Sequence, residues 1–249
     1  MAHKLKLPIL LSVLILFFSP FQTAFAQPNL TRFDVIIDVG HGGVDGGTSA
    51  KGVLEKDINL DVGTKLFHEL KQKSYRVGIT RLHDYSLSKD SRNPALSRHL
   101  RDLKQRKLIA DVINPKIFIS LHVNWSKNEK LRGPVVIYQV SGESYHLAQI
   151  IQDHLNNYYE MKKPILKGNP YFLMKKLDMP SIIVELGYIS NHKDFKILTE
   201  ESSQDELVAA IVSAIEEYFL LYPAENERDR GTGSLSQLNS SFPPTLLFG

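Results

Sequence analysis

The chain has 249 residues, of which 43% are hydrophobic and 23% charged, and its formal net charge is +3. This size and composition suit one globular domain, and they lack the basic excess that nucleic-acid-binding and membrane-surface proteins show. The sequence contains no cysteine, which excludes disulfides, a lipid-attachment cysteine and a catalytic or metal-binding thiolate. Any metal must therefore be held by histidines and carboxylates. We expect a monomer with no nucleic-acid partner.

The first 26 residues have the pattern of a secretory signal peptide. Lys4 and Lys6 precede an apolar run over 7–18, and the cleavage-site pattern Ala24-Phe25-Ala26, with small residues at its first and last positions, follows. A membrane-spanning helix needs about 20 apolar residues, so cleavage after residue 26 is favoured over an uncleaved anchor. Cleavage would lower the formal net charge from +3 to +1, and the protein is expected to be exported.

Strand and helix patterns alternate over residues 27–222, which we assign to one catalytic domain. Apolar, mostly β-branched runs predict buried strands over 32–38, 75–80, 116–122, 135–138 and 181–185. Apolar residues at helical spacing predict helices over 55–73, 100–113, 147–159 and 204–221. This alternation predicts an α/β fold, a single domain with a twisted, mostly parallel sheet flanked by helices on both faces.

Two polar segments fall outside this pattern. Residues 82–100, with a breaker at Asn93-Pro94, predict a surface loop that could flank a substrate. Beyond residue 222 the composition shifts to Asn, Ser, Gly and Pro, so 223–249 are predicted to be a disordered polar tail.

Chemically capable side chains follow three of the predicted strands. His41 lies in a Gly-His-Gly-Gly turn after the first, while His122 and Glu185 end two others. Ligands gather outside the carboxyl ends of strands in such folds. Two imidazoles with one carboxylate form a catalytic zinc site that leaves a position open for water, so His41, Glu55 and His122 are the candidate Zn²⁺ ligands.

Zinc would lower the pKa of its water toward about 7 and polarise a carbonyl group. A second carboxylate must then carry the proton from the water to the departing amine, and Glu185 is the candidate. Taken singly, these residues have ordinary explanations. The Gly-His-Gly-Gly segment could be a tight turn, and Glu55 could be an acid at a helix start whose charge is stabilised by the helix dipole. Glu185 is different, because a carboxylate after an Ile-Ile-Val run is costly to bury unless it is paired.

Four motifs, in order, resemble those of the zinc-dependent N-acetylmuramoyl-L-alanine amidases. They are IIDVGHGGVDGG at 36–47, EKDINL at 55–60, FISLHVN at 118–124 and MPSIIVELGYISN at 179–191. The resemblance covers about residues 33–221. It implies that His41, Glu55 and His122 bind zinc and that Glu185 is the catalytic acid and base.

The family's substrate is the amide bond between N-acetylmuramic acid and L-alanine in peptidoglycan, which an exported protein would meet in the periplasm or the extracellular cell wall. The compact build is similar to that of the spore-cortex amidases. Val39 stands where the family usually has proline. A wall-binding repeat and a long helical insertion between Tyr138 and Glu185 are both missing, so regulation is left to an activator protein or to timing.

Two alternatives remain at this stage. A zinc peptidase that cuts within the stem peptide would use the same metal and base. A non-catalytic peptidoglycan-binding protein would keep the fold with an inactive site, although the complete set of His41, Glu55, His122 and Glu185 argues against it.

Overall fold

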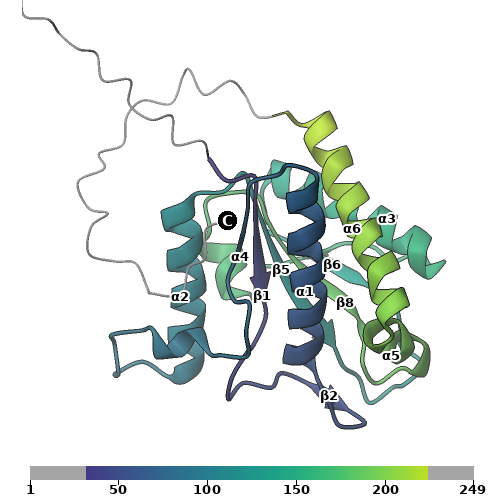
Figure 1. The fold of residues 1–249 in the computed structure, drawn as a ribbon, viewed down its shortest axis with the longest axis horizontal. Coiled ribbons are helices and arrows are strands. Elements are labelled where there is room, and N and C mark those ends of the chain that lie inside the picture. Colours follow the sequence, from purple (N-terminus) through teal and green to yellow (C-terminus); the bar gives the residue numbers. More distant parts are fainter. Residues whose placement is uncertain (1–31, 224–249) are drawn as a thin grey trace, which may run out of the picture. The chain divides into compact units, whose positions relative to one another are not determined.

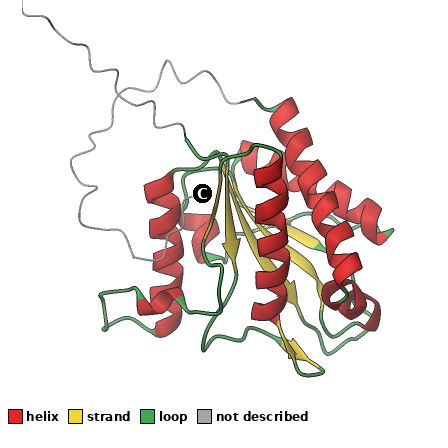
Figure 2. Ribbon diagram, in the orientation of Figure 1, coloured by secondary structure: helices red, strands yellow, loops and turns green. Residues whose placement is uncertain are grey.

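The computed structural model describes residues 32–223. The predicted signal peptide and all but the first residue of the predicted tail lie outside this range, so both remain predictions. The described residues form a sheet between two layers of helices (Figures 1 and 2). This arrangement confirms the predicted α/β class with helices on both faces.

Six strands form the main sheet, and four of them, side by side, are parallel. From edge to edge the strands are β4 (Val77–Ile79), β1 (Val35–Val39), β5 (Ile117–Asn124), β8 (Ser181–Tyr188), β6 (Val135–Tyr138) and β7 (Leu166–Lys167). β6 pairs antiparallel with β8, and β7 pairs parallel with β6. The mostly parallel sheet is thus confirmed, and its reversed edge is a feature that hydrophobic periodicity does not encode.

The first face of the sheet is covered by three long helices. These are α1 (Glu55–Gln72), α3 (Gly142–Tyr159) and α6 (Glu201–Leu221). Alternate residues of β1, Val35, Ile37 and Val39, point into this layer, where they join a core that includes Leu66 and Ile211. All four predicted helices are present, and α3 begins at Gly142 because the Oγ of Ser141 accepts a hydrogen bond from Ser144 N at 3.3 Å.

The second face is covered by α2 (Arg98–Ile113) and α4 (Phe172–Lys176). Ile36, Phe118 and Ile183 point into this smaller core, and they meet Ala110 of α2 and Met174 of α4. The helix α2 begins two residues before its predicted start, because the Oγ of Ser97 accepts a hydrogen bond from Leu100 N at 3.2 Å.

Short elements complete the fold at the carboxyl ends of the parallel strands. They are the hairpin β2 (Ser49–Ala50) and β3 (Val53–Leu54), the 3₁₀ turn η1 (Leu87–Lys89) and α5 (His192–Thr199). The turn η1 lies inside the polar segment predicted as a loop. No helix within residues 32–223 combines the length and the apolar character needed to cross a membrane.

Candidate active site

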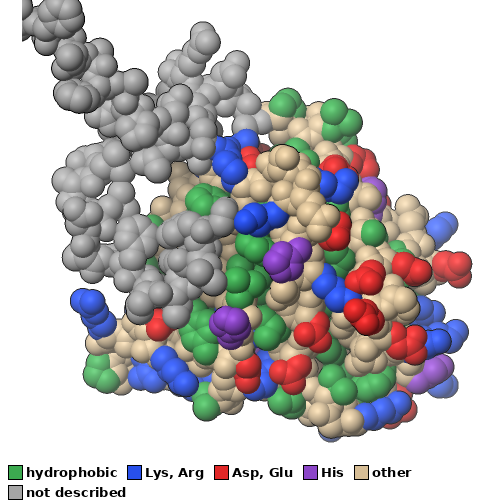
Figure 3. Space-filling model, in the orientation of Figure 1, with side chains coloured by type: hydrophobic (Ala, Val, Ile, Leu, Met, Phe, Trp, Pro, Cys, Tyr) green, Lys and Arg blue, Asp and Glu red, His purple; other side chains and the backbone are tan. Residues whose placement is uncertain are grey.

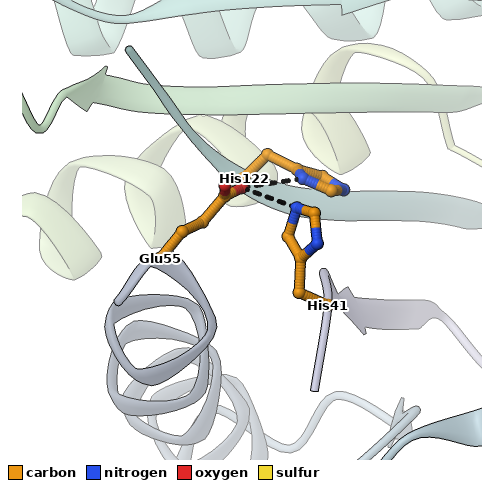
Figure 4. A group of neighbouring side chains, drawn as sticks. All are labelled: His41, Glu55 and His122. Carbon is orange, nitrogen blue, oxygen red and sulfur yellow. Dashed lines mark hydrogen bonds and ion pairs between the residues drawn. The ribbon is translucent and has the colours of Figure 1, made fainter. Parts of the chain in front are cut away.

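His41, Glu55 and His122 come together from three separate elements. His41 follows β1, Glu55 is the first residue of α1, and His122 lies on β5. Both imidazole rings point toward the Glu55 carboxylate (Figure 4), whose Oε1 lies 3.1 Å from Nε2 of His41 and 3.0 Å from Nδ1 of His122. One donor atom from each residue lies within 4.8 Å of the others.

Backbone groups hold the Glu55 carboxylate in place. Thr48 N donates to Oε2 at 2.8 Å and Val123 N donates to Oε1 at 3.0 Å. In return, the N–H groups of Glu55 and Lys56 donate to carbonyls of the preceding loop, at Thr48 and Gly46. Burial disfavours the charged form, but bonds with the two imidazoles outweigh it and hold the pKa of Glu55 well below its usual range. Glu55 is therefore an anion at neutral pH.

His41 adopts a left-handed backbone conformation with φ of 61°. For a non-glycine residue this conformation costs about 1–3 kcal/mol and persists only where surrounding contacts enforce it. One such contact is Asp45, whose Oδ1 lies 3.3 Å from Nδ1 of His41, and Asp45 is in turn paired with Arg98 of α2 at 3.3 Å. A carboxylate on the outer nitrogen orients the ring so that Nε2 faces Glu55. Neither Asp45 nor Arg98 was among the predicted site residues.

The chain crosses from β1 into the site at close quarters with β5. Gly40 N donates to Leu121 O at 3.0 Å, and a Cβ on Gly40 would lie 2.6 Å from the ring of His122, so only glycine fits. Val39 N donates to Oγ1 of Thr80 at 2.9 Å. A proline at this position would have no N–H to donate. The valine that stands here in place of the family's usual proline therefore adds a hydrogen bond between β1 and Thr80.

Glu185 lies beside this group without being one of its donors. In the sheet it is paired with His122 of β5 on one side and Val135 of β6 on the other. Its side chain is only partly exposed. Burial raises the pKa of Glu185 and the charge of Glu55 adds to the effect, although the two imidazoles oppose it. Glu55 is thus kept ionised, while the pKa of Glu185 is shifted upward. Two carboxylates with pKa values pushed apart in this way are suited to different chemical roles.

The three converging donors suit zinc, because two imidazole nitrogens and one carboxylate oxygen make up a known catalytic ligand set. Among residues 32–223, no other group of three such donors lies this close together. Of the other histidines within the described range, His154 is bonded to Glu217 at 2.6 Å. The exposed ones are His68, His83, His99, His146 and His192.

Comparisons with known proteins agree with this picture. The family model described as N-acetylmuramoyl-L-alanine amidase matches residues 35–217. The germination-specific N-acetylmuramoyl-L-alanine amidase of Bacillus subtilis strain 168 is 29% identical over 187 residues, which cover 74% of this chain and 79% of that protein.

Solved structures show the same similarity. The CwlD amidase of Clostridioides difficile, determined in complex with the GerS lipoprotein, is 30% identical with a TM-score of 0.71, and the match covers 76% of this chain and 100% of that one. The catalytic domain of CwlV from Bacillus (Paenibacillus) polymyxa var. colistinus is 28% identical with a TM-score of 0.65, over 75% of this chain and 98% of that one.

The family match includes all four motifs, and with them the three converging donors and Glu185. It extends from β1 into α6 and so takes in both faces of the sheet. The chain therefore belongs to the N-acetylmuramoyl-L-alanine amidases, a family of enzymes that degrade peptidoglycan.

Proposed function

We propose that this amidase uses Zn²⁺ held by His41, Glu55 and His122, with Glu185 as the catalytic acid and base. The observation that carries the proposal is the convergence of three donors from β1, α1 and β5 within 4.8 Å. Glu185 is placed beside His122 by the sheet register. The substrate is the amide bond between the lactyl group of N-acetylmuramic acid and L-alanine.

Bound zinc supplies Lewis-acid activation of the amide carbonyl and of the attacking water. Glu185 takes one proton from that water as the new C–O bond forms, and a raised pKa suits it to hold that proton. It then delivers the proton to the amide nitrogen as the C–N bond breaks. The second proton of the water leaves the new carboxyl group and protonates the amine, so the products are a carboxylate on the lactyl group and a free, protonated amino terminus on L-alanine.

The two earlier alternatives predict different products. A stem-peptide peptidase would release amino termini of residues further along the peptide. A binding protein would retain peptidoglycan and release none. The family match favours the amidase, because both the family and the Bacillus subtilis relative carry the name N-acetylmuramoyl-L-alanine amidase.

We further propose that the chain is exported, by a signal peptide over 1–26, and meets peptidoglycan in the periplasm or the extracellular wall. Relatives named as cell wall amidases support this location. The CwlD structure contains a lipoprotein bound to the amidase, which supports a protein activator as one means of control for this chain.

The decisive experiment is digestion of purified peptidoglycan by the purified protein, with and without a chelator, followed by identification of the newly exposed amino termini. We expect L-alanine termini that disappear with chelator and return when zinc is added back. The His41→Ala variant should lose zinc and should regain part of its activity in excess zinc. Termini of other residues would establish the peptidase, and binding without new termini would establish the binding protein.

A further inference from the structure

Two buried arginines lie beneath the loop that carries His41. Arg81 follows β4 and Arg106 belongs to α2, and their exposed fractions are 2% and 3%. Both guanidinium groups donate to the same carbonyl oxygen, Val39 O, at 3.2 Å from Nε of Arg81 and 2.8 Å from Nη1 of Arg106. Two cations have therefore been brought to one carbonyl at the end of β1.

Arg81 joins the His41 loop to the helix that carries Glu55. Its Nη2 donates to Gly40 O at 3.1 Å and to Lys56 O at 2.7 Å. Gly40 directly precedes His41, and Lys56 directly follows Glu55. One nitrogen atom thus bridges the two chain segments that present these side chains.

Arg106 joins the same loop to β5. Its Nη2 donates to His41 O at 3.0 Å, and its Nη1 contacts Oδ1 of Asp38 at 2.5 Å. The other oxygen of Asp38 accepts a hydrogen bond from Ser120 Oγ at 2.6 Å, two residues before His122. The remaining nitrogen of the guanidinium, Nε, donates to Oδ2 of Asp102 on the same helix at 2.7 Å.

The partners of Arg81 distinguish it from a member of an ordinary buried ion pair. Within residues 32–223, Arg81 donates to four backbone carbonyls and to no carboxylate. Its pKa is lowered to about 10 by burial and by the neighbouring charge of Arg106, so the site tolerates repulsion between the two cations. A planar guanidinium can reach several acceptors at once in a fixed geometry, and a lysine ammonium cannot.

We infer that Arg81 and Arg106 are positioning residues that hold the segments of His41, Glu55 and His122 in metal-binding geometry before the ion arrives. This inference rests on the proposed zinc site. It assigns to the arginines a role in zinc affinity, through the carbonyl of His41 and its neighbours, in addition to any contribution to folding.

The test compares Arg81→Lys and Arg106→Lys with the wild-type full chain. The zinc Kd is measured by competition with a chromophoric chelator, and the absorption spectrum of the Co²⁺-loaded protein reports the ligand geometry. Outer contacts of metal ligands typically change affinity about 10- to 100-fold, and we expect a loss in this range together with an altered cobalt spectrum. Apo-protein Tm is recorded for each variant.

The matched control is Arg76→Lys, the same change at an arginine whose Nε lies 3.5 Å from Oδ2 of Asp34, at the opposite end of β1 from His41. It should leave the zinc Kd and the cobalt spectrum unchanged. If Arg81→Lys and Arg106→Lys lower Tm with unchanged Kd and cobalt spectrum, the arginines are purely structural and the inference is rejected.

A gentler variant covers the case in which a lysine variant does not fold. Ser120→Ala removes only the bond from β5 to Asp38, and it should weaken zinc binding in the folded protein. An unchanged Kd in that variant would overturn the inference. Absence of zinc binding by the wild type would reject the proposed function as well, which separates the two failures.

Discussion

The region at the carboxyl ends of the parallel strands, here called the sheet edge, and the helix layer of α1 and α6 differ in where they place their charged side chains. Over α1 and α6, Lys and Arg are interspersed with Asp and Glu on the surface (Figure 3), as in the Lys65–Asp205 pair at 2.5 Å. At the sheet edge, Asp38 and Arg106 are paired with exposed fractions of 0% and 3%. Exposed pairs contribute little to stability, whereas breaking a buried pair is costly.

The difference teaches that apolar packing and the groups proposed for chemistry are concentrated in different parts of this domain. The helix layer buries apolar side chains and leaves its charges in water. The sheet edge buries charges and keeps His41 in a left-handed conformation. Substitutions at the edge should therefore change zinc binding or turnover, and substitutions in the helix layer should change the free energy of unfolding.

The largest effect is expected from Glu185→Gln at the sheet edge. The amide cannot carry the proton between water and amine, so turnover should fall about 10²- to 10⁴-fold. Zinc content and Tm should stay close to wild type, since Glu185 is not one of the converging donors. Turnover on purified peptidoglycan and zinc per chain are the two measurements, and retained turnover would reject the role of Glu185.

The second effect belongs to the helix layer. Leu66 of α1 has an exposed fraction of 0%, and Leu66→Ala should lower the free energy of unfolding by about 2–5 kcal/mol through lost burial and a cavity. Denaturant unfolding measures this loss. Turnover per folded molecule and the zinc Kd should match the wild type, and a change in either would show that the two regions are coupled.

Asp45→Asn, at the sheet edge, is expected to have a smaller effect than the two preceding variants. Asparagine can still accept a hydrogen bond from Nδ1 of His41, but it removes the charge that orients the ring, so zinc affinity should fall about 10- to 100-fold. Competition with a chelator measures the Kd. The matched control is Asp57→Asn, an exposed acid on the first turn of α1, which should leave the Kd unchanged. Equal losses in both variants would mean that general charge matters, and the contact of Asp45 does not.

Much of the fold could be predicted because long elements carry a periodic signal. The helix predicted over 55–73 is α1, and the strand at 135–138 is β6 with the same bounds. The pair Leu166–Lys167 of β7 and the five residues of α4 are too short for any period to show. The antiparallel direction of β6 depends on where the chain returns, which local pattern does not record.

The converging side chains could be predicted because each lies at the end of a strand or the start of a helix. Arg81 and Arg106 could not, since their partners are backbone carbonyls distant in sequence. Asp38 carried a usable signal, because an acid inside an Ile-Ile-Asp-Val run raises the same burial cost that marked Glu185. Its partner, Arg106, lies 68 residues away, and only the fold brings the two together.

The smallest effect is expected from Asp205→Asn on the exposed surface of α6. This change removes the charge that pairs with Lys65, whose Nζ keeps its bond to Glu201 O at 3.2 Å. Because water and salt screen exposed charges, the free energy of unfolding should fall by less than about 1 kcal/mol. Denaturant unfolding at low and high salt measures the loss, which should shrink at high salt, while turnover and zinc Kd stay unchanged. A loss as large as that of Leu66→Ala would contradict the view that the helix layer is held by apolar packing.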